Sequence, residues 1–312
     1  MALAHAFVFP GQGSQRIGML ERLPGLDALD RLLDAAESLS GLDLRRIAAE
    51  GPAAALADTC AAQPLLYLAD WAWGTSLLAA GLEPLAFAGH SVGEFAALAV
   101  AGAFSAEAGL ELVVERADLM SSTAAATPGT MAAVLGLDSC TVADLVDSIS
   151  DVWVANDNAP GQVIISGTHL GVESATIALS SAGARRIVPL QVAGPFHSPL
   201  MAPAADAFAA VLERTKLSDV AIPILQNTDP APTTDASVIA TRLRNQMTSP
   251  VRWTETMYAL RDIGVRVVVE AGPGAVLKGL ARRVEGLDAF ATGDGELKLV
   301  VNELKLVEKE VR

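Results

Sequence analysis

Short apolar segments that end in glycine or proline alternate along this chain with longer amphipathic segments. Residues 5–10 (HAFVFP) and 84–89 (PLAFAG) predict β-strands, and both lead directly into glycine-containing turns. The uninterrupted apolar run VRVVVEAG (265–272) is typical of a strand buried on both faces of a parallel sheet. These patterns predict an α/β fold with a parallel sheet as its core. A further strand is predicted at 222–227, and helices are predicted at 26–39, 64–80, 92–101, 105–125, 202–214, 235–247, 253–263 and 274–284.

Residues 128–192 have a pattern of their own. Four apolar segments of strand length and two amphipathic segments of helix length follow one another in the order βαββαβ. Because this is the order of a ferredoxin-like unit, we expect a ferredoxin-like subdomain inserted into a larger α/β domain made of residues 1–127 and 193–312. The predicted strands are 131–136, 152–157, 162–167 and 185–190, the predicted helices are 141–150 and 170–182, and the charged end NELKLVEKEVR (302–312) predicts a surface helix.

Composition and charge exclude several classes of protein. The 312 residues carry a formal net charge of -14, which opposes the phosphate binding that a nucleic-acid partner requires. Although 51% of the residues are hydrophobic, no apolar run reaches the ~18 residues of a membrane helix, and the start of the sequence lacks the basic region of a signal peptide. The two cysteines, Cys60 and Cys140, have no CxxC partner or nearby histidine cluster, so we expect no metal site. A cytoplasmic protein without nucleic-acid or membrane partners is expected.

A serine lies between two glycines in the turn that follows the strand at 84–89. The sequence GHSVG (89–93) matches the Gly-x-Ser-x-Gly turn that presents a nucleophilic serine between a strand and a helix, so Ser91 is a candidate nucleophile. The N–H of Val92, at the start of the following helix, can face a developing oxyanion. A tight turn with a capping serine fits the same five residues, and both interpretations stay open at this level.

A serine hydroxyl needs a general base, and the chain has four histidines. His197, in the loop sequence GPFHSPLM just after the inserted unit, is the candidate base, although a structural histidine fits this position equally well. The glycine-rich PGQGSQ (10–15) lacks the Gly-Lys-Ser/Thr ending of a phosphate loop, and its N–H groups are candidates for an oxyanion hole. The other three histidines lie at the start of a strand, within the serine turn and at the start of a helix: His5, His90 and His169.

Seven sequence motifs together resemble one family. The motifs are, in order, VFPGQGSQ, AAQPLL, GHSVGEFAAL, ANDNAPGQVIISG, GPFHSPLM, QMTSPVRW and VEAGPG. They are similar to the malonyl-CoA:acyl-carrier-protein transacylases of bacterial fatty-acid synthesis and to the acyltransferase domains of polyketide synthases.

The resemblance covers residues 6 to about 284 and implies an α/β-hydrolase-like domain with a ferredoxin-like insertion. It also implies ping-pong transfer of malonyl from malonyl-CoA to the phosphopantetheine thiol of an acyl carrier protein, through a malonyl-Ser91 intermediate. The resemblance further implies a monomer that needs no bound cofactor.

The resemblance assigns roles in the catalytic step. It implies that Ser91 is the nucleophile and His197 its general base. It further implies that the main-chain carbonyl of Gln246 orients the His197 ring, in place of the carboxylate of a serine triad. The N–H groups of Gln12 and Val92 would form the oxyanion hole.

The resemblance also assigns residues to the substrate. Arg116, which by its position alone fits a solvated arginine on a helix, is implied to bind the free malonyl carboxylate through paired hydrogen bonds. Phe196 is implied to exclude the methyl group of a methylmalonyl unit, a discrimination of about 1–3 kcal/mol. Gln63 and Asn158 match family positions that line the same pocket.

The carrier protein is expected to be acidic, although this chain itself carries a charge of -14. We therefore predict that the carrier contacts a local basic patch made of Lys278, Arg282 and Arg283, in which Lys278 and Arg282 lie four residues apart on one helix. A solvated helix end accounts for the same residues.

Alternatives to this function differ in pathway or in class. A discrete acyltransferase of a polyketide synthase or a malonate decarboxylase system would use the same chemistry. A serine hydrolase or thioesterase is disfavoured by Arg116 and by the lack of an evident triad acid. A non-catalytic scaffold would have no use for Ser91 and His197 together.

Overall fold

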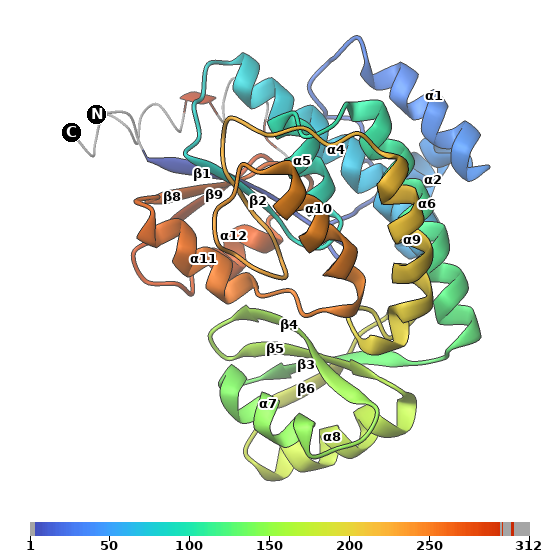
Figure 1. The fold of residues 1–312 in the computed structure, drawn as a ribbon, viewed down its shortest axis with the longest axis vertical. Helices are drawn as coiled ribbons and strands as arrows, with labels where there is room; N and C mark the ends of the chain where they lie inside the picture. The colour runs from blue at the N-terminus through green and yellow to red at the C-terminus, as the bar shows by residue number, and fades with distance from the viewer. Residues whose placement is uncertain (1–3, 294, 296–300, 303–312) are drawn as a thin grey trace.

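A five-stranded parallel sheet forms the centre of the protein. The computed structural model describes residues 4–293, 295, 301 and 302, and its sheet has the strand order β7-β2-β1-β8-β9 (Figure 1). Every neighbouring pair in this sheet is parallel, so the predicted α/β fold with a parallel core is confirmed. The strands are β1 (His5–Phe9), β2 (Ala86–Gly89), β7 (Ile224–Leu225), β8 (Val267–Glu270) and β9 (Asp288–Ala291). The helices of this part are α1 (Leu29–Ser40), α2 (Leu44–Glu50), α3 (Ala53–Ala57), α4 (Thr59–Ala79), α5 (Gly93–Ala101), α6 (Ala106–Ala126), α9 (Ala202–Arg214), α10 (Ala236–Asn245), α11 (Trp253–Asp262) and α12 (Val276–Ala281).

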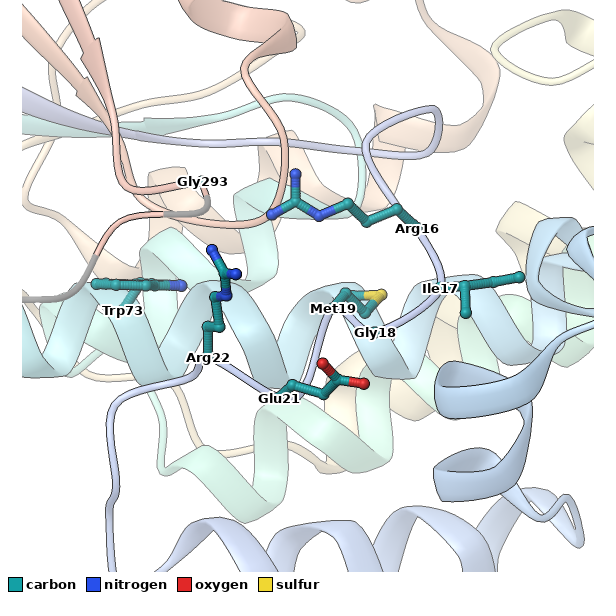
Figure 2. A pocket seen from close by; sticks show the side chains of 8 residues that line it. All are labelled: Arg16, Ile17, Gly18, Met19, Glu21, Arg22, Trp73 and Gly293. Atoms are coloured by element: carbon teal, nitrogen blue, oxygen red, sulfur yellow. The ribbon is translucent and has the colours of Figure 1, made fainter.

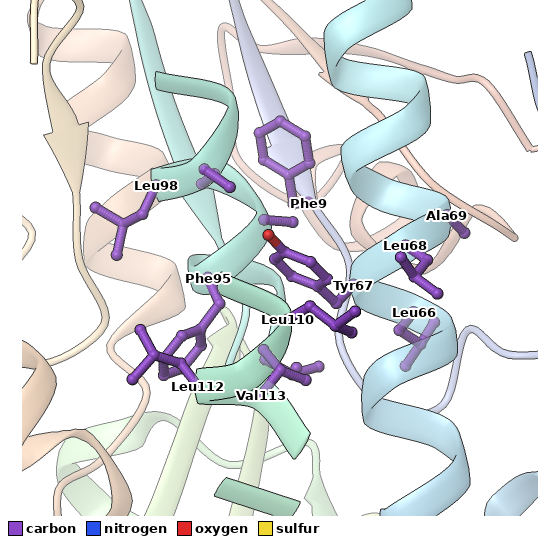
Figure 3. Packing of buried hydrophobic residues seen from close by; sticks show 14 of the residues in the cluster. Phe9, Leu66, Tyr67, Leu68, Ala69, Phe95, Leu98, Leu110, Leu112 and Val113 are labelled. Carbon is purple, nitrogen blue, oxygen red and sulfur yellow. The ribbon is translucent and has the colours of Figure 1, made fainter. Parts of the chain in front are cut away.

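Helices cover both faces of the parallel sheet. Side chains alternate across a strand, so Phe7 and Phe9 of β1 pack with α4, α5 and α6 in one core cluster. Ala6 and Val8 of the same strand pack in a second cluster with α11 and α12. Burial on both faces explains why these strands read as continuous apolar segments. Figure 3 shows part of the larger cluster, to which Phe9 of β1, Phe95 of α5 and residues of α4 and α6 belong.

An antiparallel four-stranded sheet, in the order β4-β5-β3-β6, follows α6 in the chain and lies beside the larger part (Figure 1). Helices α7 and α8 pack on one of its faces through residues such as Val142 and Leu179. Its other face turns Met131 and Ile164 toward the larger core cluster. The predicted succession βαββαβ is confirmed by β3 (Thr130–Leu135), α7 (Ser139–Asp147), β4 (Val152–Ala159), β5 (Gln162–Gly167), α8 (His169–Ser181) and β6 (Arg186–Pro189).

Hydrogen bonds connect the antiparallel sheet to the segment that precedes α11. The N–H of Val251 donates to the carbonyl of Ala155 over 2.8 Å, and the N–H of Asp157 donates to the carbonyl of Val251 over 3.0 Å. These bonds form an isolated parallel bridge between Asn156 of β4 and Val251, which lies almost 100 residues later in the sequence. They fix the antiparallel sheet against the part that carries the parallel sheet.

Several short elements of the structure were not predicted, among them helices α2 and α3 and strand β9. Helices α2 and α3 have seven and five residues, too few to show a helical period. Strand β9 has four residues that begin with Asp288, and it becomes a strand by pairing with β8 at the sheet edge. The predicted helix at 274–284 is shorter in the structure, and beyond Asn302 the predicted C-terminal helix lies outside the described residues. None of the helices within the described ranges is long and apolar enough to cross a bilayer.

The turn from β2 to α5 depends on two glycines. A Cβ atom on Gly89 would lie 2.1 Å from the carbonyl carbon of Gly93, and one on Gly93 would lie 2.2 Å from the carbonyl oxygen of Phe9. The start of α5 therefore contacts the backbone of the strands directly. Between the two glycines, Ser91 has a φ of 53°, a left-handed conformation that is uncommon for residues with a side chain.

The close approach at this turn predicts a large loss of stability in Gly93→Ala. Because the added methyl group would meet the rigid backbone of Phe9, we expect the free energy of unfolding to fall by about 2–4 kcal/mol. Gly279→Ala is the matched control, since Gly279 is exposed in α12 and its Cβ would meet nothing within 4 Å. This control should gain about 1 kcal/mol from helix propensity. Thermal and urea unfolding measure both variants, and a Gly93→Ala protein as stable as the wild type would contradict the contact.

Candidate active site

Ser91 and His197 meet at the carboxyl edge of the parallel sheet. Ser91 lies at the tip of the β2–α5 turn, and His197 lies in the loop between β6 and the short 3-10 helix η1 (Pro199–Met201). The Oγ atom of Ser91 is 2.8 Å from Nε2 of His197. On the opposite side of the ring, Nδ1 is 3.1 Å from the main-chain oxygen of Gln246. Because a carbonyl only accepts hydrogen bonds, Nδ1 carries the proton and Nε2 is free to accept one from the serine.

The His197 ring is held in its neutral form. It is 4% exposed, and burial lowers its pKa to about 3, with a further contribution from the positive charge of Arg116. An uncharged imidazole at neutral pH is the form that a general base requires. Between pH 6.5 and about pH 3 the unfolded chain binds a proton on His197 and the folded protein does not. The contribution of His197 to the free energy of unfolding is therefore highest above the ordinary pKa of about 6.5 and falls as the pH is lowered toward 3.

Arg116 is buried beside the nucleophile rather than solvated on the surface of α6. Its side chain is 0% exposed, and its Nη2 donates to Oγ of Ser91 over 3.2 Å. Nη1 donates to Oε1 of Gln63 over 2.7 Å, while Nε and Nη2 donate to Oε1 of Gln246 over 3.2 and 3.0 Å. Burial lowers the pKa of Arg116 to about 10, and the nearby Glu94 opposes this shift, so the guanidinium stays charged at neutral pH. All of these acceptors are uncharged groups.

Gln246 contacts each of the three residues around the reaction centre. Its main-chain oxygen faces His197, its Oε1 accepts from Arg116, and its Nε2 donates to the main-chain oxygen of Ser91 over 3.1 Å. It is 1% exposed and begins the 3-10 helix η2 (Gln246–Thr248) that follows α10. The sequence assigned a role to its carbonyl only, and the contacts of its side chain were missed.

Two backbone N–H groups are available at the same place. Among the residues that the structure describes, no main-chain oxygen accepts a hydrogen bond from the N–H of Gln12 or of Val92. Gln12 lies in the turn after β1, and Val92 precedes the first residue of α5. Gln12 and Ser91 line one pocket, so the arrangement offers donors next to the nucleophile.

This pocket has a volume of about 300 Å³ and lies between the two sheets. Phe196, Met120 and His197 line one side of it, and Met131 and Ile164 of the antiparallel sheet line another. Its wall is therefore largely apolar, with the polar groups of Ser91, His197 and Gln12 exposed at one place.

Asn158 also lines the pocket, where its Oδ1 is 2.8 Å from Nε2 of His90. His90 lines the same pocket, so this contact fixes its ring at the pocket wall. Val276, the first residue of α12, lines the same pocket. Lys278 is half-buried on α12, whereas Arg282 and Arg283 are exposed at and just beyond the end of this helix. The three basic residues of the predicted patch thus follow the pocket-lining Val276 within a few residues of the sequence.

A second pocket, of about 410 Å³, shares no lining residue with the first (Figure 2). In Figure 2 the guanidinium groups of Arg16 and Arg22 point toward the same space, near Trp73 of α4. None of the residues predicted for the site lines it. Within the described ranges, no group of three or more His, Cys, Asp or Glu residues is placed to hold a metal ion.

Two further residues at the site were missed from the sequence. Glu94, in the first turn of α5, is fully buried, and its carboxylate accepts from the N–H of Asn227 over 2.8 Å. The side chain of Asn227 in turn contacts the turn that holds Ser91. The only sequence signal for Glu94 was a single acidic residue in the otherwise apolar stretch GEFAALAVA, and for Asn227 there was none beyond its place after a strand.

Comparisons with known proteins agree on one family. The family model described as "Acyl transferase domain" matches residues 6–293. The malonyl CoA-acyl carrier protein transacylase of Bacillus subtilis is 39% identical over 307 residues, which are 96% of this chain and 97% of that protein. The solved structure of the corresponding transacylase from Coxiella burnetii is 32% identical, with a TM-score of 0.90 over 97% of this chain and 98% of that one. A malonyl-transacylase solved in complex with its type II polyketide synthase acyl-carrier protein is 36% identical, with a TM-score of 0.89 over 96% and 99%.

The neutral state of His197 predicts an unusual pH profile for Ser91. Because the ring stays unprotonated down to a pKa of about 3, a small neutral fluorophosphonate should inactivate Ser91 at a rate that varies little between about pH 5 and pH 8. The rate is measured by quenching the reaction at set times and determining the fraction of labelled protein by mass spectrometry. The Ser91→Ala protein gives the background labelling at other residues. A rate that falls with a midpoint near pH 6.5 would show that His197 titrates normally.

Proposed function

The chain belongs to the malonyl-CoA:acyl-carrier-protein transacylases, and we propose that Ser91 carries the malonyl group during the transfer. The enzyme moves malonyl from coenzyme A to the thiol of an acyl carrier protein. The observation that carries our mechanism is the set of contacts around one atom. Oγ of Ser91 lies 2.8 Å from a neutral histidine nitrogen and 3.2 Å from a buried guanidinium.

In the first half-reaction, Ser91 attacks the thioester carbonyl of malonyl-CoA. Nε2 of His197 takes the hydroxyl proton as the Oγ–carbon bond forms, and the carbonyl oxygen becomes an oxyanion. The N–H groups of Gln12 and Val92 stabilise this oxyanion, a contribution of two to three orders of magnitude for each such donor. The carbon–sulfur bond then breaks, and the proton on His197 passes to the sulfur of coenzyme A.

In the second half-reaction, the phosphopantetheine thiol of the carrier protein takes the place of coenzyme A. His197 accepts the thiol proton, and the sulfur attacks the malonyl ester on Ser91. When the ester bond breaks, the proton returns to Oγ, so the enzyme ends in its starting state. The pantetheine arms belong to the two substrates, and the mechanism requires no bound cofactor.

Arg116 binds the free carboxylate of the malonyl group. Its charge is buried, and its present partners are two amide oxygens and one hydroxyl, which leave the positive charge uncompensated by direct contact. A carboxylate that arrives with the substrate can form a charge-assisted, bidentate pair with this guanidinium. An acetyl group brings no such charge and leaves the buried guanidinium with Glu94 nearby but with no carboxylate in direct contact.

The remaining features of the proposal follow the same family. The larger part is α/β-hydrolase-like, formed by residues 1–127 and 193–312, and residues 128–192 form a ferredoxin-like subdomain. Phe196 lines the pocket beside His197, where its ring restricts the space for an α-methyl group. The carrier protein binds at Lys278, Arg282 and Arg283, beyond the pocket-lining Val276. The protein acts as a monomer in the cytoplasm.

The pathway that receives the malonyl group has two candidates. We favour fatty-acid synthesis, because the motifs resemble the transacylases of that pathway. The similarity to a transacylase solved with its type II polyketide synthase carrier favours a polyketide pathway as the second candidate. Comparing the transfer rates to carrier proteins of the two kinds separates them.

The role of Arg116 predicts a change of acyl preference in Arg116→Met, which keeps a side chain of similar length and removes the charge. Loss of the ion pair with the malonyl carboxylate should cost roughly 2–5 kcal/mol, so kcat/KM for malonyl-CoA falls by well over tenfold. The kcat/KM for acetyl-CoA should hold or rise, because the uncompensated charge is gone. Melting curves serve as the control for folding. An unchanged ratio of malonyl to acetyl transfer would remove Arg116 from its assigned role.

A further inference from the structure

The carboxamide of Asn227 bridges the two ends of the nucleophile turn. Its Oδ1 accepts a hydrogen bond of 2.7 Å from the N–H of Ser91, and its Nδ2 donates one of 2.5 Å to the carbonyl oxygen of Gly89. Asn227 comes just after β7, the strand next to β2, and is 1% exposed. One side chain from a neighbouring strand thus satisfies backbone groups on both sides of His90.

These two bonds restrain a conformation that Ser91 would not adopt readily on its own. A residue with a Cβ and a φ of 53° carries a local strain of about 1–3 kcal/mol, which persists only where surrounding contacts hold it. In this conformation Oγ lies 2.8 Å from Nε2 of His197. Gln246 still holds the Ser91 carbonyl, but without the bridge the N–H side of the turn loses its restraint, and the turn can relax and move Oγ away from the base.

The bridge also selects the donors that face the reacting carbonyl. The N–H of Ser91 is bound to Asn227 and is therefore directed away from the pocket. This leaves the N–H groups of Gln12 and Val92 for the oxyanion. Relaxation of the turn would release the Ser91 N–H and rotate the neighbouring Val92 N–H. The contact between Asn227 and the Ser91 N–H therefore fixes the orientation of both the Ser91 hydroxyl and the Val92 N–H.

Asn227 is itself fixed from two directions. The carboxylate of Glu94, in the first turn of α5, accepts from the Asn227 N–H over 2.8 Å, and the Asn227 carbonyl accepts from the N–H of Arg252 over 3.0 Å. Because Glu94 is fully buried, the hydrogen bonds that it accepts are costly to break. Helix α5, through Glu94, therefore fixes Asn227, and Asn227 in turn fixes the turn at Ser91.

We propose that Asn227 is a positioning residue for acyl transfer, acting by holding Ser91 and the Val92 N–H in their reactive geometry. This inference rests on the proposed role of Ser91 as the nucleophile. Asn227 does not line the pocket, and none of its described hydrogen bonds involves Arg116, so we expect its effect on the rate of the chemical step. Affinity for the substrate and the preference for malonyl over acetyl lie outside its influence.

The test is Asn227→Ala, assayed with malonyl-CoA, acetyl-CoA and a small neutral fluorophosphonate. A misplaced nucleophile costs up to about 100-fold in rate, so we expect kcat to fall by about 10- to 100-fold for both acyl groups, with KM and the malonyl-to-acetyl ratio unchanged. The fluorophosphonate should inactivate Ser91 more slowly by a similar factor. This readout needs no malonyl transfer, so it distinguishes failure of the positioning role from failure of the proposed function.

Gln226→Ala is the matched control. The amide of Gln226 is also fully buried and donates to Glu94 and to the carbonyl of Ile239, yet it does not contact the turn. Its loss should lower the melting temperature while kcat stays within a few-fold of the wild type. Equal losses of kcat in the two variants would overturn the proposal, as would Asn227→Ala rates within twofold of the wild type. If Asn227→Ala does not fold, Asn227→Ser decides, since its short hydroxyl cannot bridge Ser91 and Gly89 and the same loss is expected.

Discussion

A full positive charge buried next to the nucleophile is the constraint on which the site depends. The Arg116 side chain is fully buried, so its N–H groups must find hydrogen-bond acceptors within the protein. Gln63 and Gln246 accept through their amides, and Ser91 accepts through its hydroxyl. The same charge helps to keep His197 neutral. In the proposed mechanism, a buried cation without an acid in contact favours a substrate that brings its own carboxylate, so the geometry of the site would account for a preference for malonyl.

The fold supplies this arrangement from elements that are far apart in the sequence. Parallel strands bring their carboxyl ends to one edge, where the turns after β1, β2 and β7 provide Gln12, Ser91 and Asn227. The antiparallel sheet adds the opposite wall of the pocket, and the loop that leaves it carries His197. Ser91 and His197 therefore come from two parts of the structure, and the hydrogen bonds between β4 and Val251 help to hold those parts together.

The sequence was sufficient for the features that have a local signature. The glycine spacing identified the turn at Ser91, and the apolar segments identified the strands and the order βαββαβ. Features that depend on tertiary contact were not accessible. Strand β9 exists because it pairs with β8, and the burial of Arg116 arises from the packing of α6 against α4 and α5. The roles of the Gln246 and Asn227 side chains depend on the atoms that they contact in the fold. The pattern of apolar and polar positions along the sequence cannot predict such contacts.

Mass spectrometry of the intact protein mixed with malonyl-CoA tests the central claim most directly. Our account predicts a single malonyl adduct that maps to the peptide containing Ser91, persists in buffer and disappears when a carrier protein with a free phosphopantetheine thiol is added. The malonyl group should then be found on the carrier. An adduct on another residue, no adduct at all, or rapid release of free malonate without the carrier would contradict transfer through Ser91.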